Sequence, residues 1–348
     1  MKKLILSPVG MSLFLNILNN DERREGWQDQ LNRIANKADL DGDDLKKVLE
    51  LKDRVINKLE SSKPDKCRNI SAELNGIFGL YSEIEQGKAD HHLLIGTDTF
   101  VGRQAVEVIE AFLQEKGFST DSIIPKKLSA DSSDDFSDGM KDLLNECEKR
   151  IPDFRKSGYE VIFNLTAAFK VLQSYLNIVG MFYADRLVYI FQGSNQLLSI
   201  PRLPIKTDTE QIAGHANELA YLAAGGSLKP EKLIGIPEAL LRRKADNTYE
   251  LSEWGVLIWN TIKNEILSEK LLDFPYIEYD KQFMKEFNLS KDIPLKIDLQ
   301  ETLAVISVIL TIESGDITEL KKDGGLQYSN YDASVKTLFL TRIPFANP

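Results

Sequence analysis

Short apolar runs alternate with longer amphipathic segments along the first 205 residues of the chain. In the longer segments the apolar residues recur every three or four positions, which predicts helices, while the short runs predict buried strands. Strands alternating with helices predict an α/β fold built on an open, mostly parallel sheet. The strands are expected at residues 3–6, 90–95, 122–128, 159–164, 187–191 and 197–205.

The segments between these strands predict helices of different kinds. Residues 21–63 are charged and carry apolar positions at helical spacing, which predicts an amphipathic hairpin of two helices. The last strand contains two prolines, which suit the edge of a sheet because proline cannot donate a hydrogen bond to a neighbouring strand. Single helices are expected at residues 70–85, 100–116 and 136–151, and from about Thr166.

Three of the predicted strands end in small polar residues. One breaks at Asn164 and is followed by Thr166 and Lys170, and the strands that precede Gly10 and Gly96 end in similar turns. Because ligands of parallel sheets bind outside the carboxyl ends of the strands, we expect these three turns to converge on one ligand. Unpaired N–H groups and a helix dipole at such a junction favour phosphate. The sequence therefore predicts a nucleotide-binding site at this edge.

The second half of the chain changes character. A helix, a short β-wing and another helix are typical of a winged-helix-like connector, which we place at residues 206–268. Residues 269–348 predict a small α+β unit, so three parts are expected, the first being the sheet-containing domain at residues 1–205. The helices and strands of the last part are expected at residues 279–287, 299–312, 324–328 and 337–343.

Composition narrows the classes of function. The chain has 348 residues, of which 43% are apolar, and a net charge of −10, so broad attraction to free nucleic acid is not expected. Cys67 and Cys147 show no metal-ligand spacing, and the adjacent His91 and His92 point to opposite faces of a strand, so no metal site is predicted. The apolar run after Lys3 is too short for a secretory leader, and no stretch is long enough to span a membrane. We expect a soluble, cytoplasmic protein without a membrane partner.

Four motifs follow in order along the first domain: SPVGMSL at residues 7–13, GTDT at 96–99, NLTAAFK at 164–170 and IPRLPI at 200–205. Together they resemble the CARF domains of type III CRISPR accessory proteins. The resemblance covers residues 1–205 and implies a Rossmann-like homodimer whose strand ends form a pocket across the two-fold axis. That pocket binds cyclic oligoadenylate, most often the tetra-adenylate. The ligand contacts that it implies are Pro8, Val9, Gly10, Met11, Ser12, Thr97, Asp98, Asn164, Thr166, Ala167, Ala168 and Lys170.

The resemblance also suggests roles for single residues. Lys170 would neutralise phosphate, and Ser12 and Thr166 would donate hydroxyl hydrogen bonds. Ala167 and Ala168 stand where relatives usually carry two glycines, which let the backbone approach a phosphate most closely. Some CARF domains cleave their ring, and Ser12 and Lys170 occupy the positions of the groups that assist this reaction. Ring cleavage is therefore an alternative to binding alone.

The C-terminal part lacks the motifs of two common nuclease classes. A HEPN ribonuclease needs an Arg followed about four to six residues later by a His, and none of the three histidines follows an Arg in this way. No strand carries the acidic pair and lysine of a metal-dependent restriction-type nuclease. Residues 279–287 (YDKQFMKEF) and 319–326 (ELKKDGGL) instead resemble RelE-type toxins, which cut mRNA on the ribosome without metal. The implied catalytic candidates are Lys321, Lys322, Tyr328, Tyr331, Lys336 and Arg342.

These resemblances give one reading and two alternatives. The first is a CRISPR effector, activated by cyclic oligoadenylate, that acts as a ribosome-dependent endoribonuclease on mRNA with no cofactor besides this activator. The second is a ring nuclease in which the C-terminal part is a structural lid. The third is a ligand-responsive transcription regulator that uses residues 207–263 as a DNA-binding wing.

Overall fold

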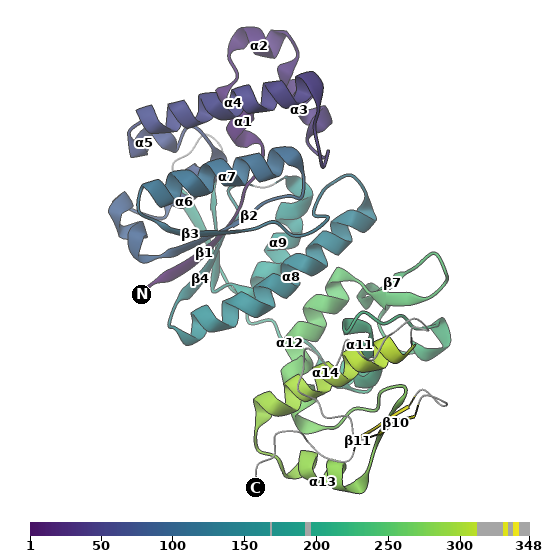
Figure 1. The fold of residues 1–348 in the computed structure, drawn as a ribbon. Helices are drawn as coiled ribbons and strands as arrows, with labels where there is room; N and C mark the ends of the chain where they lie inside the picture. The colour runs from purple at the N-terminus through teal and green to yellow at the C-terminus, as the bar shows by residue number, and fades with distance from the viewer. Residues whose placement is uncertain (168, 192–195, 312–329, 333–336, 341–348) are drawn as a thin grey trace. The chain divides into compact units, whose positions relative to one another are not determined.

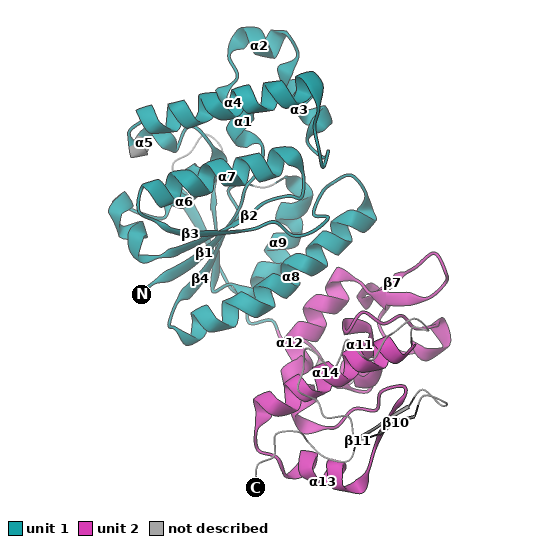
Figure 2. Ribbon diagram, in the orientation of Figure 1, with its two compact units in different colours: residues 1–205 teal, residues 206–348 magenta. Residues whose placement is uncertain are grey.

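The structure is a computed structural model that describes residues 1–167, 169–191, 196–311, 330–332 and 337–340. The chain forms two compact units, residues 1–205 and 206–348, which Figure 2 shows in different colours. The first unit ends at the residue where the sequence places the end of the sheet-containing domain. Each unit has a hydrophobic core of its own.

The first unit is built on a six-stranded sheet with the order β3-β2-β1-β4-β5-β6. Strands β1 to β5 are parallel, and β6 pairs antiparallel with β5 at one edge. β1 lies in the interior of the sheet, where Ile5 stands opposite His92 of β2 and Ile162 of β4. The predicted mostly parallel α/β fold is therefore confirmed. The strands are β1 (Lys3–Pro8), β2 (His91–Ile95), β3 (Ser119–Ile123), β4 (Glu160–Asn164), β5 (Arg186–Ile190) and β6 (Leu197–Pro201).

Helices cover both faces of this sheet (Figure 1). α6 and α7 lie on one face and α8 and α9 on the other, while α4 packs over α7 as an outer layer. Because both faces are covered, β1 is buried from Leu4 to Pro8 and reads as a nearly continuous apolar run. The helices are α1 (Ser12–Ile17), α2 (Asn20–Arg24), α3 (Trp27–Ile34), α4 (Gly42–Ser61), α5 (Pro64–Cys67), α6 (Ala72–Gly79), the 3-10 helix Ile84–Ala89, α7 (Phe100–Glu115), α8 (Ser133–Lys156) and α9 (Lys170–Tyr183).

Three helices replace the hairpin of two predicted over residues 21–63. α2 ends at Arg24, and Gly26, with a φ of +81°, turns the chain before α3 begins at Trp27. A left-handed residue interrupts the helical hydrogen-bond ladder, and glycine adopts this conformation without steric cost. The periodicity predicted the helical content correctly but not the break.

Several other predicted boundaries in the first unit are wrong. The third strand ends at Ile123 rather than at residue 128, the last strand ends at Pro201 rather than at residue 205, and α8 spans Ser133–Lys156 rather than residues 136–151. α6 ends at Gly79 rather than at residue 85. The third strand begins at Ser119, ahead of the predicted residue 122, because its polar start does not read as an apolar run. The helix expected from about Thr166 begins at Lys170, so an irregular loop separates β4 from α9. The last difference matters for function, since it changes which groups face the sheet edge.

The second unit contains a short hairpin between two helices. β7 and β8 pair antiparallel, with Arg242 opposite Glu250, and they correspond to the predicted β-wing. One core joins residues from Ile212 to Leu310, so the expected boundary after residue 268 does not separate two cores. The elements up to this point are α10 (Thr209–Ala213), α11 (Ala216–Ala223), the 3-10 helices Pro230–Lys232 and Glu238–Leu240, β7 (Leu241–Arg243), β8 (Tyr249–Leu251) and α12 (Glu253–Glu269).

The last part of the second unit joins two helices to a three-stranded sheet. The strand order is β10-β11-β9, in which β11 pairs parallel with β9 and antiparallel with β10. Phe283 and Phe287 are fully buried on one face of α13, as their spacing predicts. The strand expected at residues 324–328 lies outside the described residues. The elements are β9 (Ile277–Tyr279), α13 (Lys281–Leu289), α14 (Ile293–Thr311), β10 (Asn330–Asp332) and β11 (Thr337–Leu340).

Helix length and apolarity also bear on membrane insertion. Within the described residues, no helix combines the length and the apolar character needed to cross a membrane.

Candidate functional site

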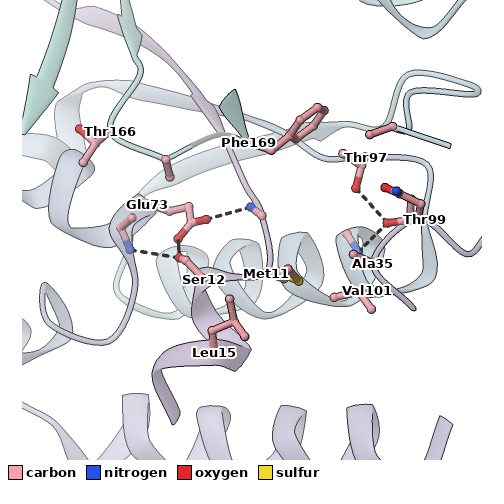
Figure 3. A pocket seen from close by; sticks show the side chains of 16 residues that line it. Met11, Ser12, Leu15, Ala35, Glu73, Thr97, Thr99, Val101, Thr166 and Phe169 are labelled. Atoms are coloured by element: carbon pink, nitrogen blue, oxygen red, sulfur yellow. Dashed lines mark hydrogen bonds between the residues drawn. The ribbon is translucent and has the colours of Figure 1, made fainter. Parts of the chain in front are cut away.

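A pocket of about 370 Å³ lies at the carboxyl ends of β1, β2 and β4 (Figure 3). This volume is within the usual range of small-molecule sites. The loop after each of the three strands contributes to the wall, so the turns that the sequence expects to converge do so in the fold. The lining residues are Gly10, Met11, Ser12, Leu15, Ala35, Asn36, Ala72, Glu73, Thr97, Thr99, Val101, Gly102, Ala130, Thr166, Ala167 and Phe169.

The loop after β1 is held by a buried carboxylate. Glu73 lies in the first turn of α6 and is completely buried. Its Oε1 accepts a hydrogen bond from the Gly10 N–H at 2.8 Å, and its Oε2 accepts one from the Ser12 hydroxyl at 2.7 Å. The Ser12 oxygen in turn accepts the Ala72 N–H at 3.3 Å. The hydroxyl proton that the sequence assigns to phosphate is therefore directed at Glu73.

The pKa of Glu73 is raised, and burial is the main cause. The hydrogen bonds from Gly10 and Ser12 favour the ionised form and act in the opposite direction. Sequence reasoning missed this residue, although an acid in the otherwise uncharged run AELNGIFG at residues 72–79 was a visible signal. An acid near a helix start is usually explained by the helix dipole, and this explanation hides the link to the β1 loop.

The loop after β2 presents hydroxyl groups to the pocket. Thr99 caps α7 by accepting the Gly102 N–H at 3.1 Å, and its hydroxyl lies 2.9 Å from that of Thr97. A Cβ at Gly102 would lie 2.0 Å from the Thr97 hydroxyl oxygen, so only glycine permits this approach. Asp98 does not line the pocket, because it accepts hydrogen bonds from the Arg103 guanidinium and the Lys127 N–H.

The loop after β4 is tied to the neighbouring strands by buried polar groups. The Asn164 amide donates to Ser7 of β1 at 3.1 Å, and the Thr166 hydroxyl accepts the Ile190 N–H of β5 at 3.1 Å. α6 packs closely here, since a Cβ at Gly76 would lie 2.3 Å from Asn164 Oδ1. Asn164 is fully buried and therefore joins strands, whereas Thr166 remains part of the pocket wall.

Phe169 and Lys170 occupy different surroundings at the start of α9. Phe169 lines the pocket and packs edge-on against Phe136 of α8, with 6.1 Å between the ring centroids. Lys170 is exposed and does not line the pocket. The N-cap residue of α9, Phe169, provides no side-chain cap for the first N–H groups of the helix.

The charge of the pocket differs from the sequence expectation. Of the described residues that line it, none is Lys, Arg or His, and Glu73 is the single acid. The remaining walls combine hydroxyls with apolar groups such as Met11, Leu15 and Val101. Charged residues lie instead around a second hollow of about 660 Å³, which shares Asn36 with the pocket and includes Arg33, Lys37 and Lys127.

One comparison with known proteins bears on this site. Residues 68–203 match a family described as "CRISPR-associated protein (Cas_APE2256)". That part of the chain is similar to a CRISPR-associated family. The matched segment includes Glu73, Thr97, Thr166 and Lys170, while the β1 loop precedes it. The match supports the CRISPR association that the sequence predicts.

The predicted ligand contacts fall into three groups in the structure. Six line the pocket: Gly10, Met11, Ser12, Thr97, Thr166 and Ala167. Five do not: Pro8, Val9, Asp98, Asn164 and Lys170. Pro8 and Val9 are buried, and the Val9 N–H donates to the Ile95 carbonyl, so they join β1 to β2. Ala168 lies outside the described residues.

Most of the predicted catalytic residues of the C-terminal part fall on positions that the structure does not describe. Lys321, Lys322, Tyr328, Lys336 and Arg342 lie outside the described residues. Tyr331 belongs to β10, opposite Leu338 of β11. Across the described part of the chain, no group of three His, Cys, Asp or Glu residues is placed to hold a metal ion.

Proposed function

We propose that this protein is a CRISPR accessory effector that is activated by cyclic oligoadenylate, most readily cyclic tetra-adenylate. One observation carries the proposal: the loops after β1, β2 and β4 line a single pocket at the carboxyl edge of a parallel sheet. Ligands of open α/β sheets bind at this edge. The CRISPR-associated family match over residues 68–203 directs the proposal to a CRISPR signal rather than to a general nucleotide.

The chemistry of the pocket suits part of an adenylate. Apolar walls at Met11, Val101 and Phe169 accommodate a purine, and the hydroxyls of Thr97 and Thr166 suit a ribose. The uncapped N–H groups at the start of α9, next to Ala167, favour a phosphate there. The pocket of one chain therefore fits a nucleoside unit of a ring, with the phosphates towards α9.

A second copy of the chain completes the proposed site. Exposed apolar side chains occur on α9, on the antiparallel edge strand β6 and just after it: Val171, Ile178, Leu198, Ile200, Leu203 and Ile205. Exposed apolar residues on neighbouring elements mark association surfaces. Lys170 directly precedes Val171, so it lies beside this surface. In a two-fold homodimer, Lys170 would reach the phosphates of a ring that is itself symmetric.

The effector part is a metal-independent endoribonuclease of the RelE type that cuts mRNA on the ribosome. The order strand, two helices and two strands over β9, α13, α14, β10 and β11 is compatible with this resemblance. Its catalytic groups are drawn from Lys321, Lys322, Tyr328, Lys336 and Arg342. Ring binding activates the nuclease only if the ring binds the active arrangement more tightly than the resting one.

A translation experiment tests the proposal. Purified protein is added to ribosomes translating a defined mRNA, with and without cyclic tetra-adenylate, and in the presence of EDTA at a level that keeps the ribosomes intact. Ligand-dependent cleavage of translated mRNA is expected. mRNA that stays intact under every condition would contradict the proposed nuclease activity. If the ring binds but mRNA is not cleaved, the result supports only the sensor function.

The same samples address the ring nuclease. Radiolabelled ring is recovered and its linear products are separated by chromatography. Ring opening that depends on Ser12 and Lys170 would support that alternative. Ser12 donates its hydroxyl proton to Glu73, and Lys170 lies outside the pocket. We therefore expect the ring to bind without being opened rapidly.

A further inference from the structure

The β1 loop offers hydrogen-bond donors to an anion, and a side chain of the protein already occupies them. The Gly10 N–H and the Ser12 hydroxyl both point at the Glu73 carboxylate, at 2.8 and 2.7 Å (Figure 3). Glu73 is completely buried, and its side chain lies in the wall of the pocket. The Glu73 carboxylate is therefore an internal anion, and it occupies the position that a bound phosphate would take.

The described surroundings leave this carboxylate without a cation. The lining of the pocket contains no Lys, Arg or His among the residues that the structure describes. Lys3 of β1 pairs with Asp90 at 3.2 Å, and Arg186 of β5 pairs with Glu160 at 2.7 Å. Arg68 after α5 donates through Nε to Asn75 of α6 at 3.1 Å, and its buried Nη2 has no described hydrogen-bond partner, Glu73 included. An ionised Glu73 therefore makes the pocket floor negative.

We propose that Glu73 selects ligands by charge: it rejects the terminal phosphate of ordinary mononucleotides from the pocket floor and admits the uncharged adenosine units of a ring. This inference rests on the proposed function, because it assumes that an adenylate binds here. It assigns to Glu73 a specificity role that is separate from binding strength.

The charges of the two ligand classes explain the selection. A terminal phosphate carries between one and two negative charges at pH 7, whereas each phosphate of a ring is a diester with a single charge. A dianion close to a buried carboxylate is repelled strongly, because low polarity strengthens the interaction between charges. A ring can place its phosphates away from Glu73, towards the start of α9. AMP has a flexible terminal phosphate, and it cannot keep this phosphate away from Glu73 in the same way.

Replacing Glu73 by glutamine removes the charge with little change in shape. In Glu73→Gln the amide oxygen still accepts the Gly10 N–H, and the amide NH2 donates to the Ser12 oxygen. The shape is kept, the negative charge is lost, and the Ser12 proton becomes free to face the ligand. Glu83→Gln is the matched control, since Glu83 is an exposed residue beyond the end of α6.

The test is competition against labelled cyclic tetra-adenylate by adenosine and by AMP, measured with the full-length protein. In the wild type and in Glu83→Gln, AMP should compete no better than adenosine. In Glu73→Gln, the ratio of AMP to adenosine potency should rise at least tenfold. An unchanged ratio in folded Glu73→Gln overturns the inference while leaving the proposed function intact. No binding of the ring by any variant removes the proposed function itself.

A measurement on the wild type keeps the inference testable if Glu73→Gln does not fold. At pH 8 the phosphate of AMP is a dianion, whereas the phosphate of AMP methyl ester carries a single charge. In the wild type, AMP should therefore compete at least threefold more weakly than its methyl ester. Equal potencies of AMP and its methyl ester contradict the inference.

Discussion

The two ends of the six-stranded sheet differ in what their polar groups face. At one end they surround a pocket, and at the other they mostly bind one another. At the carboxyl end, threonines, a serine and one buried acid surround a pocket of about 370 Å³. At the amino end, Lys3, Tyr81, Asp90 and His92 pack into a cluster without a comparable hollow among the described pockets. The first arrangement leaves room for a ligand, whereas the second pairs most of its polar groups with one another, His92 Nδ1 being buried without a described partner.

The cluster at the amino end is a hydrogen-bonded network centred on Asp90. Asp90 is 3% exposed and accepts hydrogen bonds from the Lys3 N–H at 2.8 Å, the Lys3 ammonium at 3.2 Å and the Tyr81 hydroxyl at 3.0 Å. The Tyr81 hydroxyl also lies 3.3 Å from His92 Nε2. Burial raises the pKa of Tyr81 and lowers the pKa of His92 to about 4. These are large shifts at a place that none of the described pockets includes.

The comparison shows that shifted pKa values do not by themselves locate a functional site. Perturbed groups are enriched at active sites, but structural networks perturb them as well. Here the discriminating feature is accessibility, because of the two ends, as far as the described residues show, it is the carboxyl end that combines donors, acceptors and a pocket. Glu73 shares features of both ends, since it is buried like Asp90 and lines the pocket.

The largest expected effect concerns the amino end. Asp90→Ala leaves the partly exposed Lys3 ammonium without its acid and the buried Tyr81 hydroxyl without its Asp90 acceptor, so the free energy of unfolding should fall by about 2–4 kcal/mol. Urea denaturation measures this change. Asp153→Ala, which removes an exposed pair with Lys156, should cost less than about 1 kcal/mol. A loss below that of the control would show that the network does not hold the sheet.

The next effect is expected where α6 meets β4. Alanine normally favours a helix over glycine by about 1 kcal/mol. In Gly76→Ala the new Cβ would lie 2.3 Å from Asn164 Oδ1 and 2.7 Å from Thr166 Oγ1, so the protein should lose about 1–3 kcal/mol of unfolding free energy. Gly214→Ala, which meets nothing within 4 Å, is the control for thermal denaturation. Stabilisation of Gly76→Ala would contradict the close packing.

A smaller effect is expected on ligand affinity. Lys170→Ala should weaken binding of cyclic tetra-adenylate about 10- to 100-fold, because a charged hydrogen bond to phosphate is worth about 1.5–3 kcal/mol. Lys88→Ala, which removes an exposed lysine near the amino end of the sheet, should leave the affinity unchanged. Isothermal titration calorimetry measures both variants. Equal affinities would place the phosphates away from α9.

The smallest effect is a pH dependence of stability that arises at the amino end. The pKa of His92 is about 4 in the folded chain and about 6.5 when unfolded, so the unfolded state binds a proton first as the pH falls. His92 should therefore reduce stability progressively from about pH 6.5 down to 4, by about 1–2 kcal/mol at pH 5. His92→Gln should lose less stability than the wild type between pH 7 and 5. Equal losses of stability in the wild type and in His92→Gln between pH 7 and 5, measured by denaturation, would contradict this assignment.

Most of the sheet could be predicted from the sequence, since its strands are buried on both faces and read as apolar runs. β3 was placed late because its first residues, Ser119, Thr120 and Asp121, are polar. β9, with three residues, is too short to give a pattern of its own. The break at Gly26 depends on backbone conformation, which periodicity does not report.

The candidate site was predictable in outline. The turns after β1, β2 and β4 are recognisable in the sequence by their small polar residues, and the fold brings them together. Asn164 and Asp98 have residue types that suit ligands, but tertiary hydrogen bonds use them within the protein. Glu73 was missed because its partner Gly10 is 63 positions away in the sequence. Local patterns carry no information about such a contact.

The reversed direction of β6 determines where the chain leaves the first unit. Because β6 runs antiparallel to β5, its last residue Pro201 stands opposite Arg186, the first residue of β5. The peptide that leads out of the first unit therefore starts at the end of the sheet remote from the pocket, and the Arg202 N–H donates to the Asp185 carbonyl there. A ligand bound at the carboxyl edge of the sheet would therefore be separated from this exit peptide by the full length of β6.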